Sequence, residues 1–183
     1  MLMKSMLVGA LLTEDATPGP PERDTDVEAL LLHIGVRYLL LAPLYGYSLR
    51  KLIVEGNGGP SWFTEYNVLT GLSARSYGRF ATSVTRVAAG RVGRGLPASL
   101  THCGYKTFSL YPFYGAFLSS RAFQTTTGIG RYLDMTDLGT ENFERDSFYF
   151  NQAEKIIARE RGHGPLFLYV YTVANHFPWD IRL

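Results

Sequence analysis

The stretch that most constrains the fold of this chain is PLFLYVYTVAN, residues 165–175, a nearly continuous run of apolar and aromatic side chains. A short run of this kind is typical of a strand that is buried on both faces. Such strands occur in parallel sheets that carry helices on both sides. The chain must therefore supply neighbouring strands and covering helices.

The rest of the second half contains segments that fit these requirements. Residues 96–104, LPASLTHCG, predict a short helix, and residues 105–112, YKTFSLYP, alternate like a strand. Residues 113–134 are rich in aromatic residues, Gly and Thr and predict a loop region. Residues 145–162 predict a helix with one apolar side, formed by Phe148, Ala153, Ile156 and Ile157. This order predicts an α/β fold with a mostly parallel sheet flanked by helices.

The first half is less regular. Residues 13–28 are acidic and proline-rich and predict a linker, while residues 29–53 predict one or two apolar helices. We therefore divide the chain into a divergent or poorly ordered N-terminal segment, 1–54, and an α/β domain, 55–183.

Membrane insertion is not indicated by hydropathy. No stretch reaches the roughly 18 to 20 uninterrupted apolar residues that a spanning helix needs. Residues 29–47 come closest, but they contain His33, Arg37 and Pro43. The first 12 residues hold a short apolar run without a cleavage site, so they do not predict a signal peptide.

The composition, with 46% apolar and 19% charged residues, is that of a globular protein. The net charge of +2 is too small to indicate nucleic-acid binding. One local group of basic residues predicts a solvated face, with a polyanion site as the alternative: Arg75, Arg79, Arg86, Arg91 and Arg94.

Two places in the sequence put polar groups where an α/β protein binds ligands. Asn175 and His176 follow the buried strand directly, and ligands of parallel sheets lie outside the carboxyl ends of the strands. Ser61 follows the glycine-rich turn EGNGGP and stands at the predicted start of a helix, where unpaired N–H groups favour an anion. Ser61 could equally be an N-cap, with Thr64 or Glu65 reaching back to it.

Four stretches in order, SWFTEYNVLTGLSARSYGRF, GYKTFSLYPFYGAF, SSRAFQTTTGIGRYLD and VANHFPWD, resemble the sulfatase-like branch of the alkaline phosphatase superfamily. Lipoteichoic-acid-synthase-type and phosphoethanolamine-transferase-type enzymes are the most similar members. The resemblance covers about residue 56 to the C-terminus. It implies a partial alkaline-phosphatase-like fold, a divalent metal (Zn or Mn) and a hydroxyl nucleophile.

The resemblance also implies roles for individual residues. The family pattern has an acidic residue four positions after the nucleophile, which makes Ser61 the nucleophile and a metal ligand, with Glu65 following. Thr64 is the second candidate hydroxyl. The same pattern assigns substrate binding to His176, with Asn175 beside it. Arg121 and the aromatic segment YPFYGAF either lie near the site or pack in the core.

The sequence departs from the family in three respects. The usual Gly-Gly-Thr turn reads Gly-Pro-Ser here, and Pro60 removes an N–H that could have faced an anion. The Cys/Ser-x-Pro-x-Arg motif that is converted to formylglycine is absent, which disfavours sulfate-ester hydrolysis by that route. The acidic residue of the first strand and the late Asp-His pair, both metal ligands in the family, have no match.

We therefore expect an internal part of a metal-dependent hydrolase or phosphoryl transferase that is inactive alone. The alternative is a non-catalytic binding module that retains the fold, and a third hypothesis uses residues 29–47 as a membrane anchor. The expected partner is a phosphate or sulfate ester, lipid-linked or glycan. Nucleic acid is not expected, and the oligomeric state is left open. The family implies a membrane-associated or extracytoplasmic location.

Overall fold

The computed structural model describes residues 8–13, 40–41, 48–49 and 60–174. The strands of the main sheet, in spatial order, are β1 (Val8–Thr13), β6 (Leu166–Tyr171), β4 (Lys106–Leu110) and β5 (Arg131–Leu133). Strands β4, β5 and β6 run parallel, and β1 pairs antiparallel with β6. The predicted α/β fold with a mostly parallel sheet is therefore confirmed.

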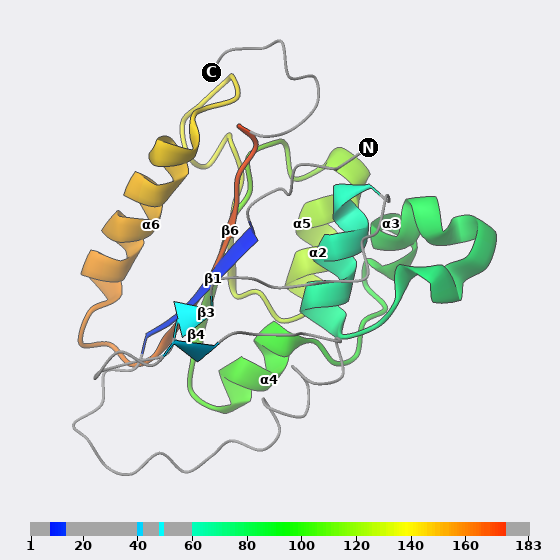
Figure 1. Ribbon diagram of the computed structural model, residues 1–183, viewed down its shortest axis with the longest axis horizontal. Helices are drawn as coiled ribbons and strands as arrows, with labels where there is room; N and C mark the ends of the chain where they lie inside the picture. The colour runs from blue at the N-terminus through cyan, green and yellow to red at the C-terminus, as the bar shows by residue number, and fades with distance from the viewer. Residues whose placement is uncertain (1–7, 14–39, 42–47, 50–59, 175–183) are drawn as a thin grey trace.

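Helices cover both faces of this sheet (Figure 1). One face carries α6, and the other carries the remaining described helices. In chain order they are α2 (Ser61–Thr70), η1 (Ala74–Ser83), α3 (Val84–Ala88), α4 (Leu96–His102), η2 (Phe117–Ser119), α5 (Ser120–Thr126) and α6 (Asp146–Glu160). Among the described residues, no helix is both long and apolar enough to cross a membrane.

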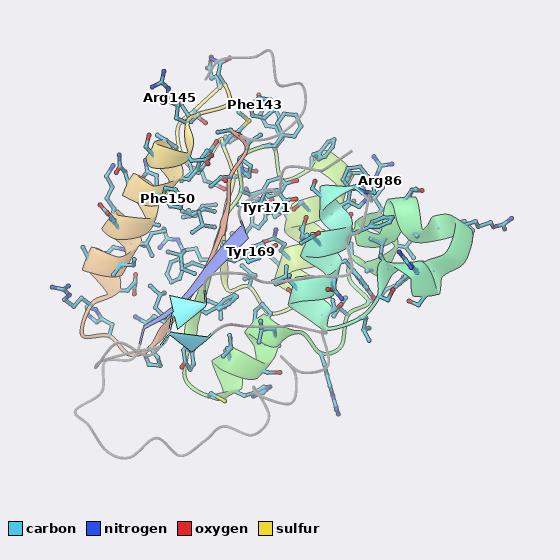
Figure 2. The ribbon with its side chains drawn as sticks, in the orientation of Figure 1. Arg86, Phe143, Arg145, Phe150, Tyr169 and Tyr171 are labelled. Carbon is cyan, nitrogen blue, oxygen red and sulfur yellow. The ribbon has the colours of Figure 1, made fainter. Side chains whose placement is uncertain are left out.

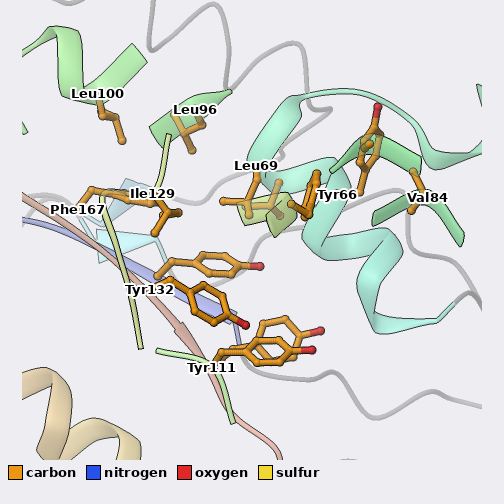
Figure 3. Packing of buried hydrophobic residues seen from close by; sticks show 14 of the residues in the cluster. Tyr66, Leu69, Val84, Leu96, Leu100, Tyr111, Ile129, Tyr132 and Phe167 are labelled. Atoms are coloured by element: carbon orange, nitrogen blue, oxygen red, sulfur yellow. The ribbon is translucent and has the colours of Figure 1, made fainter. Parts of the chain in front are cut away.

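Strand β6 joins the two halves of the hydrophobic core. All six of its residues are buried, as the apolar run predicts. Alternate side chains point to opposite faces of a strand. Phe167, Tyr169 and Tyr171 accordingly pack toward α2, α4 and α5, whereas the other three residues pack toward α6. Figure 3 shows part of the first cluster, with Tyr66 and Leu69 of α2 close to the aromatic rings of the sheet.

Several predicted elements are confirmed. Residues 96–102 form α4, residues 106–110 form β4 and residues 146–160 form α6. Helix α2 also forms, and it ends at Gly71, whose φ of 71° is left-handed and is easily adopted by glycine.

Other expectations are wrong. The loop predicted for residues 113–134 contains α5 and the three-residue strand β5. Within the predicted helical range 29–53, the described residues form two short antiparallel strands, β2 (Leu40–Leu41) and β3 (Ser48–Leu49). Residues 8–13 were not predicted as a strand. These strands are too short, or too dependent on a partner, to show a clear period of two.

A close contact between α4 and the end of α5 requires glycine at residue 128. Gly128 has a φ of 105°, and a Cβ atom there would meet the backbone of Ala98. The Ala98 N–H donates to the carbonyl of Thr127 at 3.0 Å, and the Thr107 hydroxyl donates to the carbonyl of Gly128 at 2.9 Å. Gly128 therefore allows α4, α5 and β4 to meet.

We expect Gly128→Ala to lower the free energy of unfolding by about 3 kcal/mol or more, because the added methyl combines backbone strain with a clash. Gly139 also has a positive φ, of 72°, but open space around it. Gly139→Ala should lower the free energy of unfolding by only about 1 to 2 kcal/mol. Urea unfolding measures both variants, and equal losses would contradict the packing argument.

Candidate functional site

The carboxyl ends of the three parallel strands lie at one edge of the sheet. Strand β4 leads into Tyr111, β5 leads into Asp134, and β6 ends at Tyr171. Strand β1 runs the other way and its last residue, Thr13, lies opposite Leu166 at the amino end of β6. Since ligands of such sheets bind outside the carboxyl ends, this edge is the candidate site.

Ser61 lies at this edge. It is the first residue of α2 and is half-buried, and the side chains of Ser61 and Tyr171 share a hydrogen bond. The N-cap of the helix is Pro60, whose side chain cannot cap. The alternative in which Ser61 is the N-cap is therefore wrong, and its hydroxyl faces the end of β6 instead. Thr64, the second candidate, lies within the first turn of the same helix.

Glu65 follows one helical turn later and is almost completely buried, with 1% of its surface exposed. One carboxylate oxygen accepts hydrogen bonds from the Ser120 hydroxyl at 3.1 Å and the Gln124 amide at 2.9 Å. Burial raises the pKa of Glu65 to about 7, although these two hydrogen bonds act to lower it. Glu65 thus changes its charge close to neutral pH, and it does not reach back to cap α2.

Four buried tyrosines surround this carboxyl group. Burial raises the pKa of each of them, and the negative charge of Glu65 raises it further. The Tyr132 hydroxyl donates to the Ser120 hydroxyl at 3.1 Å, which links it to Glu65. Figure 2 shows Tyr169 and Tyr171 beside β6 on the side that faces α2. The four residues are Tyr111, Tyr132, Tyr169 and Tyr171.

Arg121 also lies at the carboxyl edge, in the first turn of α5. Its guanidinium group contacts the carboxylates of Asp134 at 2.8 Å and Asp137 at 2.6 Å, and it lies over the Tyr132 ring at 4.8 Å. Burial would lower the pKa of Arg121, but hydrogen bonds to both aspartates raise it. Because these carboxylates already balance its charge, substrate binding by Arg121 stays a prediction.

The segment before Arg121 is strained. Leu118 and Ser119 have φ values of 49° and 58°, in the left-handed region that residues with side chains rarely adopt. Thr85 holds this segment by donating from its hydroxyl to the carbonyl of Leu118 at 2.9 Å. Strain of this kind is common near functional sites, and here it sets the start of α5.

Aromatic side chains gather at the same edge. Phe113 lies between Phe117 and Phe143, with ring centroids 5.1 and 5.5 Å away, and Phe117 lies 6.3 Å from Trp62. Phe117 and Phe143 are each more than 40% exposed. The segment YPFYGAF therefore contributes to the core through Tyr111 and to the surface of the edge through Phe117.

Two of the predicted residues, Asn175 and His176, lie outside the described residues. Strand β6 ends four residues before Asn175 in the sequence, so the chain leaves the sheet at the expected edge. Residues 60–174 contain no group of three or more His, Cys, Asp or Glu side chains that could hold a metal ion. Ser61 is thus the one predicted metal ligand that the structure describes.

A helix that starts with a hydroxyl group beside the ends of parallel strands places this chain among α/β proteins that bind ligands at a sheet edge. Comparison with family models is more specific, because the model described as Sulfatase matches residues 62–182. This chain belongs to the sulfatase family. The family match confirms the resemblance to the sulfatase-like branch of the alkaline phosphatase superfamily.

Solved structures show the same fold. The chain is similar to the lipoteichoic acid synthase LtaP from Listeria monocytogenes, with 22% identity and a TM-score of 0.58, over 65% of this chain and 29% of that chain. It is also similar to a protein in the alkaline phosphatase superfamily from Vibrio parahaemolyticus, with 18% identity, a TM-score of 0.44, and coverage of 55% and 30%. The chain thus spans about a third or less of these proteins. No curated protein gave a significant match.

The polar partners of Glu65 were missed in the sequence. Ser120 and Gln124 are four residues apart, so they share one face of α5 and reach the same carboxylate. This spacing is visible in SSRAFQ, but it has a meaning only if the segment is helical. The loop predicted for residues 113–134 concealed it.

Glu65→Gln tests whether the buried carboxyl group titrates near pH 7. The folded protein keeps a proton on Glu65 that the unfolded chain releases near the ordinary pKa of 4.5, so the free energy of unfolding falls as pH rises from about 4.5 to about 7. The stability of the variant relative to wild type should rise across this window, by on the order of 3 kcal/mol.

The measurement is urea unfolding at several pH values between 4 and 8. Glu154→Gln is the matched control, because Glu154 is exposed on α6 and its replacement should give a flat difference. A flat difference for Glu65→Gln as well would contradict a pKa near 7.

Proposed function

We propose that this chain carries the nucleophile-bearing part of an ester hydrolase or transferase of the sulfatase family, and that Ser61 is the nucleophile. The observation that carries the proposal is the half-buried Ser61 hydroxyl at the first residue of α2, beside the carboxyl end of β6. A ligand at this edge meets a hydroxyl, unpaired helix N–H groups and the positive end of the helix dipole.

These groups suit attack on a phosphate or sulfate ester. The Ser61 oxygen forms a bond to phosphorus or sulfur while the bond to the leaving alcohol breaks. The proton of Ser61 is released and the alcohol takes up a proton. Donors fixed at the start of α2 favour the negative charge on the ester oxygens as this charge redistributes.

The proposal includes a divalent metal, zinc or manganese, only as a family expectation. When bound, such an ion would lower the pKa of a coordinated hydroxyl and neutralise charge on the ester. The described residues offer Ser61 alone for it, so they do not form a metal site by themselves. We derive no step through the metal, and its other ligands would have to lie outside the described residues.

Asn175 and His176 are proposed to bind the ester oxygens or the group attached to them, because they follow the strand that ends beside Ser61. Arg121 is proposed as a further substrate contact at the same edge. The substrate is a phosphate or sulfate ester, lipid-linked or glycan, and the name of the LtaP neighbour supports a phosphate-containing polymer. A membrane-associated or extracytoplasmic location and a domain boundary near residue 55 belong to the same proposal.

A non-catalytic module that binds such anions is the second candidate. The pairing of Arg121 with Asp134 and Asp137 favours it, because this arginine has a structural role already. Titration calorimetry with Mn²⁺ and Zn²⁺ separates the two candidates. Tight binding of one or two ions per chain supports the catalytic proposal, and no binding supports the module.

Covalent labelling tests the nucleophile without a metal. A fluorophosphonate transfers its phosphonyl group to an activated serine and releases fluoride, and intact mass measures the adduct. We expect one adduct, on Ser61, that is lost in Ser61→Ala and kept in Thr64→Ala. An adduct that persists in Ser61→Ala, or none on the wild type, would contradict the role of Ser61.

Turnover tests whether the chain works alone. With Mn²⁺ or Zn²⁺ present, we expect no hydrolysis of a chromogenic phosphodiester or phosphomonoester by the 183-residue chain, since the described residues lack a full ligand set. Turnover that Ser61→Ala abolishes would refute this inactivity while supporting Ser61 as the nucleophile.

A further inference from the structure

A continuous polar network lies beneath the start of α2. The Tyr132 hydroxyl donates to Ser120, and Ser120 and Gln124 both donate to Glu65. Each of these hydrogen bonds joins buried atoms, and each member except Glu65 comes from α5 or β5. Since a buried polar network is stable only when its members are paired, it holds the first turns of α2 against the sheet.

Ser61 is connected to the same region through Tyr171. Ser61 and Glu65 are four residues apart on α2 and therefore lie on one face of the helix, the face toward the sheet. The Tyr171 side chain is hydrogen-bonded to Ser61 and also lies close enough to Glu65 to interact with its charge. Tyr171 thus lies between the buried carboxyl group and the half-buried hydroxyl.

The Tyr171 ring has little freedom to move. It is only 5% exposed and packs against the rings of Tyr111 and Tyr169, with centroids at 5.2 and 6.2 Å. Tyr111 in turn packs against Tyr132 at 5.6 Å. A hydroxyl group on a ring held in this way can keep its partner in one orientation.

Tyr169 provides a contrast two residues earlier on the same strand. Its side chain points to the same face of the sheet, is completely buried and also faces Glu65. Its hydroxyl has no hydrogen-bond partner among the described residues. Two tyrosines in nearly the same surroundings therefore differ in one respect, the hydrogen bond to Ser61.

We propose that Tyr171 is a positioning residue, whose hydroxyl group orients the Ser61 oxygen for attack at the carboxyl edge of the sheet. This inference rests on the proposed role of Ser61. A serine side chain has three staggered positions about χ1, and a nucleophile must be held in the one that faces the ester. Tyr171 selects that position from the protein side, while the buried network fixes the helix turn that carries Ser61.

The hydrogen bond can be measured without any reaction. In protein labelled with ¹³C at the tyrosine Cζ atoms, the shift of this carbon reports hydrogen bonding of the hydroxyl. We expect Ser61→Ala to move the Tyr171 resonance and to leave the Tyr169 resonance in place. An unchanged Tyr171 resonance would overturn the inference, whatever the fate of Ser61 as the nucleophile.

The effect on reactivity is measured with the fluorophosphonate label. We expect Tyr171→Phe to slow labelling of Ser61 by about tenfold or more, because the oxygen loses its orientation. Tyr169→Phe should stay within about twofold of the wild type. Thermal unfolding of both variants checks that each is folded, since each replacement removes one oxygen and keeps the ring.

The outcomes separate this inference from the proposed function. Equal labelling rates for the wild type and Tyr171→Phe overturn the positioning role and leave Ser61 as the nucleophile. Failure of the wild type to label overturns the proposed function and the positioning role with it, even where the Tyr171 resonance responds to Ser61→Ala. Slow labelling of Tyr171→Phe together with a responsive resonance supports both.

Discussion

Burial of β6 on both faces is the constraint on which the rest of the described structure depends. Its six side chains alternate between the core under α6 and the core under α2, α4 and α5, so the strand joins both layers. It also pairs on both sides, with β1 and with β4. Because β6 cannot shift by one residue without exchanging its two faces, the position of Tyr171 at its carboxyl end is determined.

A buried charge is the second constraint, and it acts against stability. Glu65 loses contact with water, and its two hydrogen bonds only partly offset that loss, as its raised pKa shows. An apolar residue at this position of α2 would pack with less penalty. The carboxyl group instead ties α2 to α5, so Glu65 links the helix that carries Ser61 to the segment that carries Arg121.

The confirmed and the missed elements differ in where their information lies. Helix α6 and strand β6 carry their own signal, since one has an apolar side and the other is apolar throughout. Strand β5 has three residues and forms because Tyr132 and its neighbours pair with β4. Helix α5 follows two residues with left-handed φ, and no local pattern in the loop-like sequence before it predicts that geometry. Strand β1 exists through its pairing with β6.

By itself, the sequence determined the layered α/β class, the buried strand, the helix that begins at Ser61 and the family, since each rests on local pattern or on ordered motifs. Only the tertiary structure decided that Glu65 lies in the core, that Arg121 is paired with two aspartates, and that Tyr171 meets Ser61. The physical reason is that burial and hydrogen bonding depend on residues far apart in the chain. Ser61 and Tyr171 come together only because α2 packs against the end of β6.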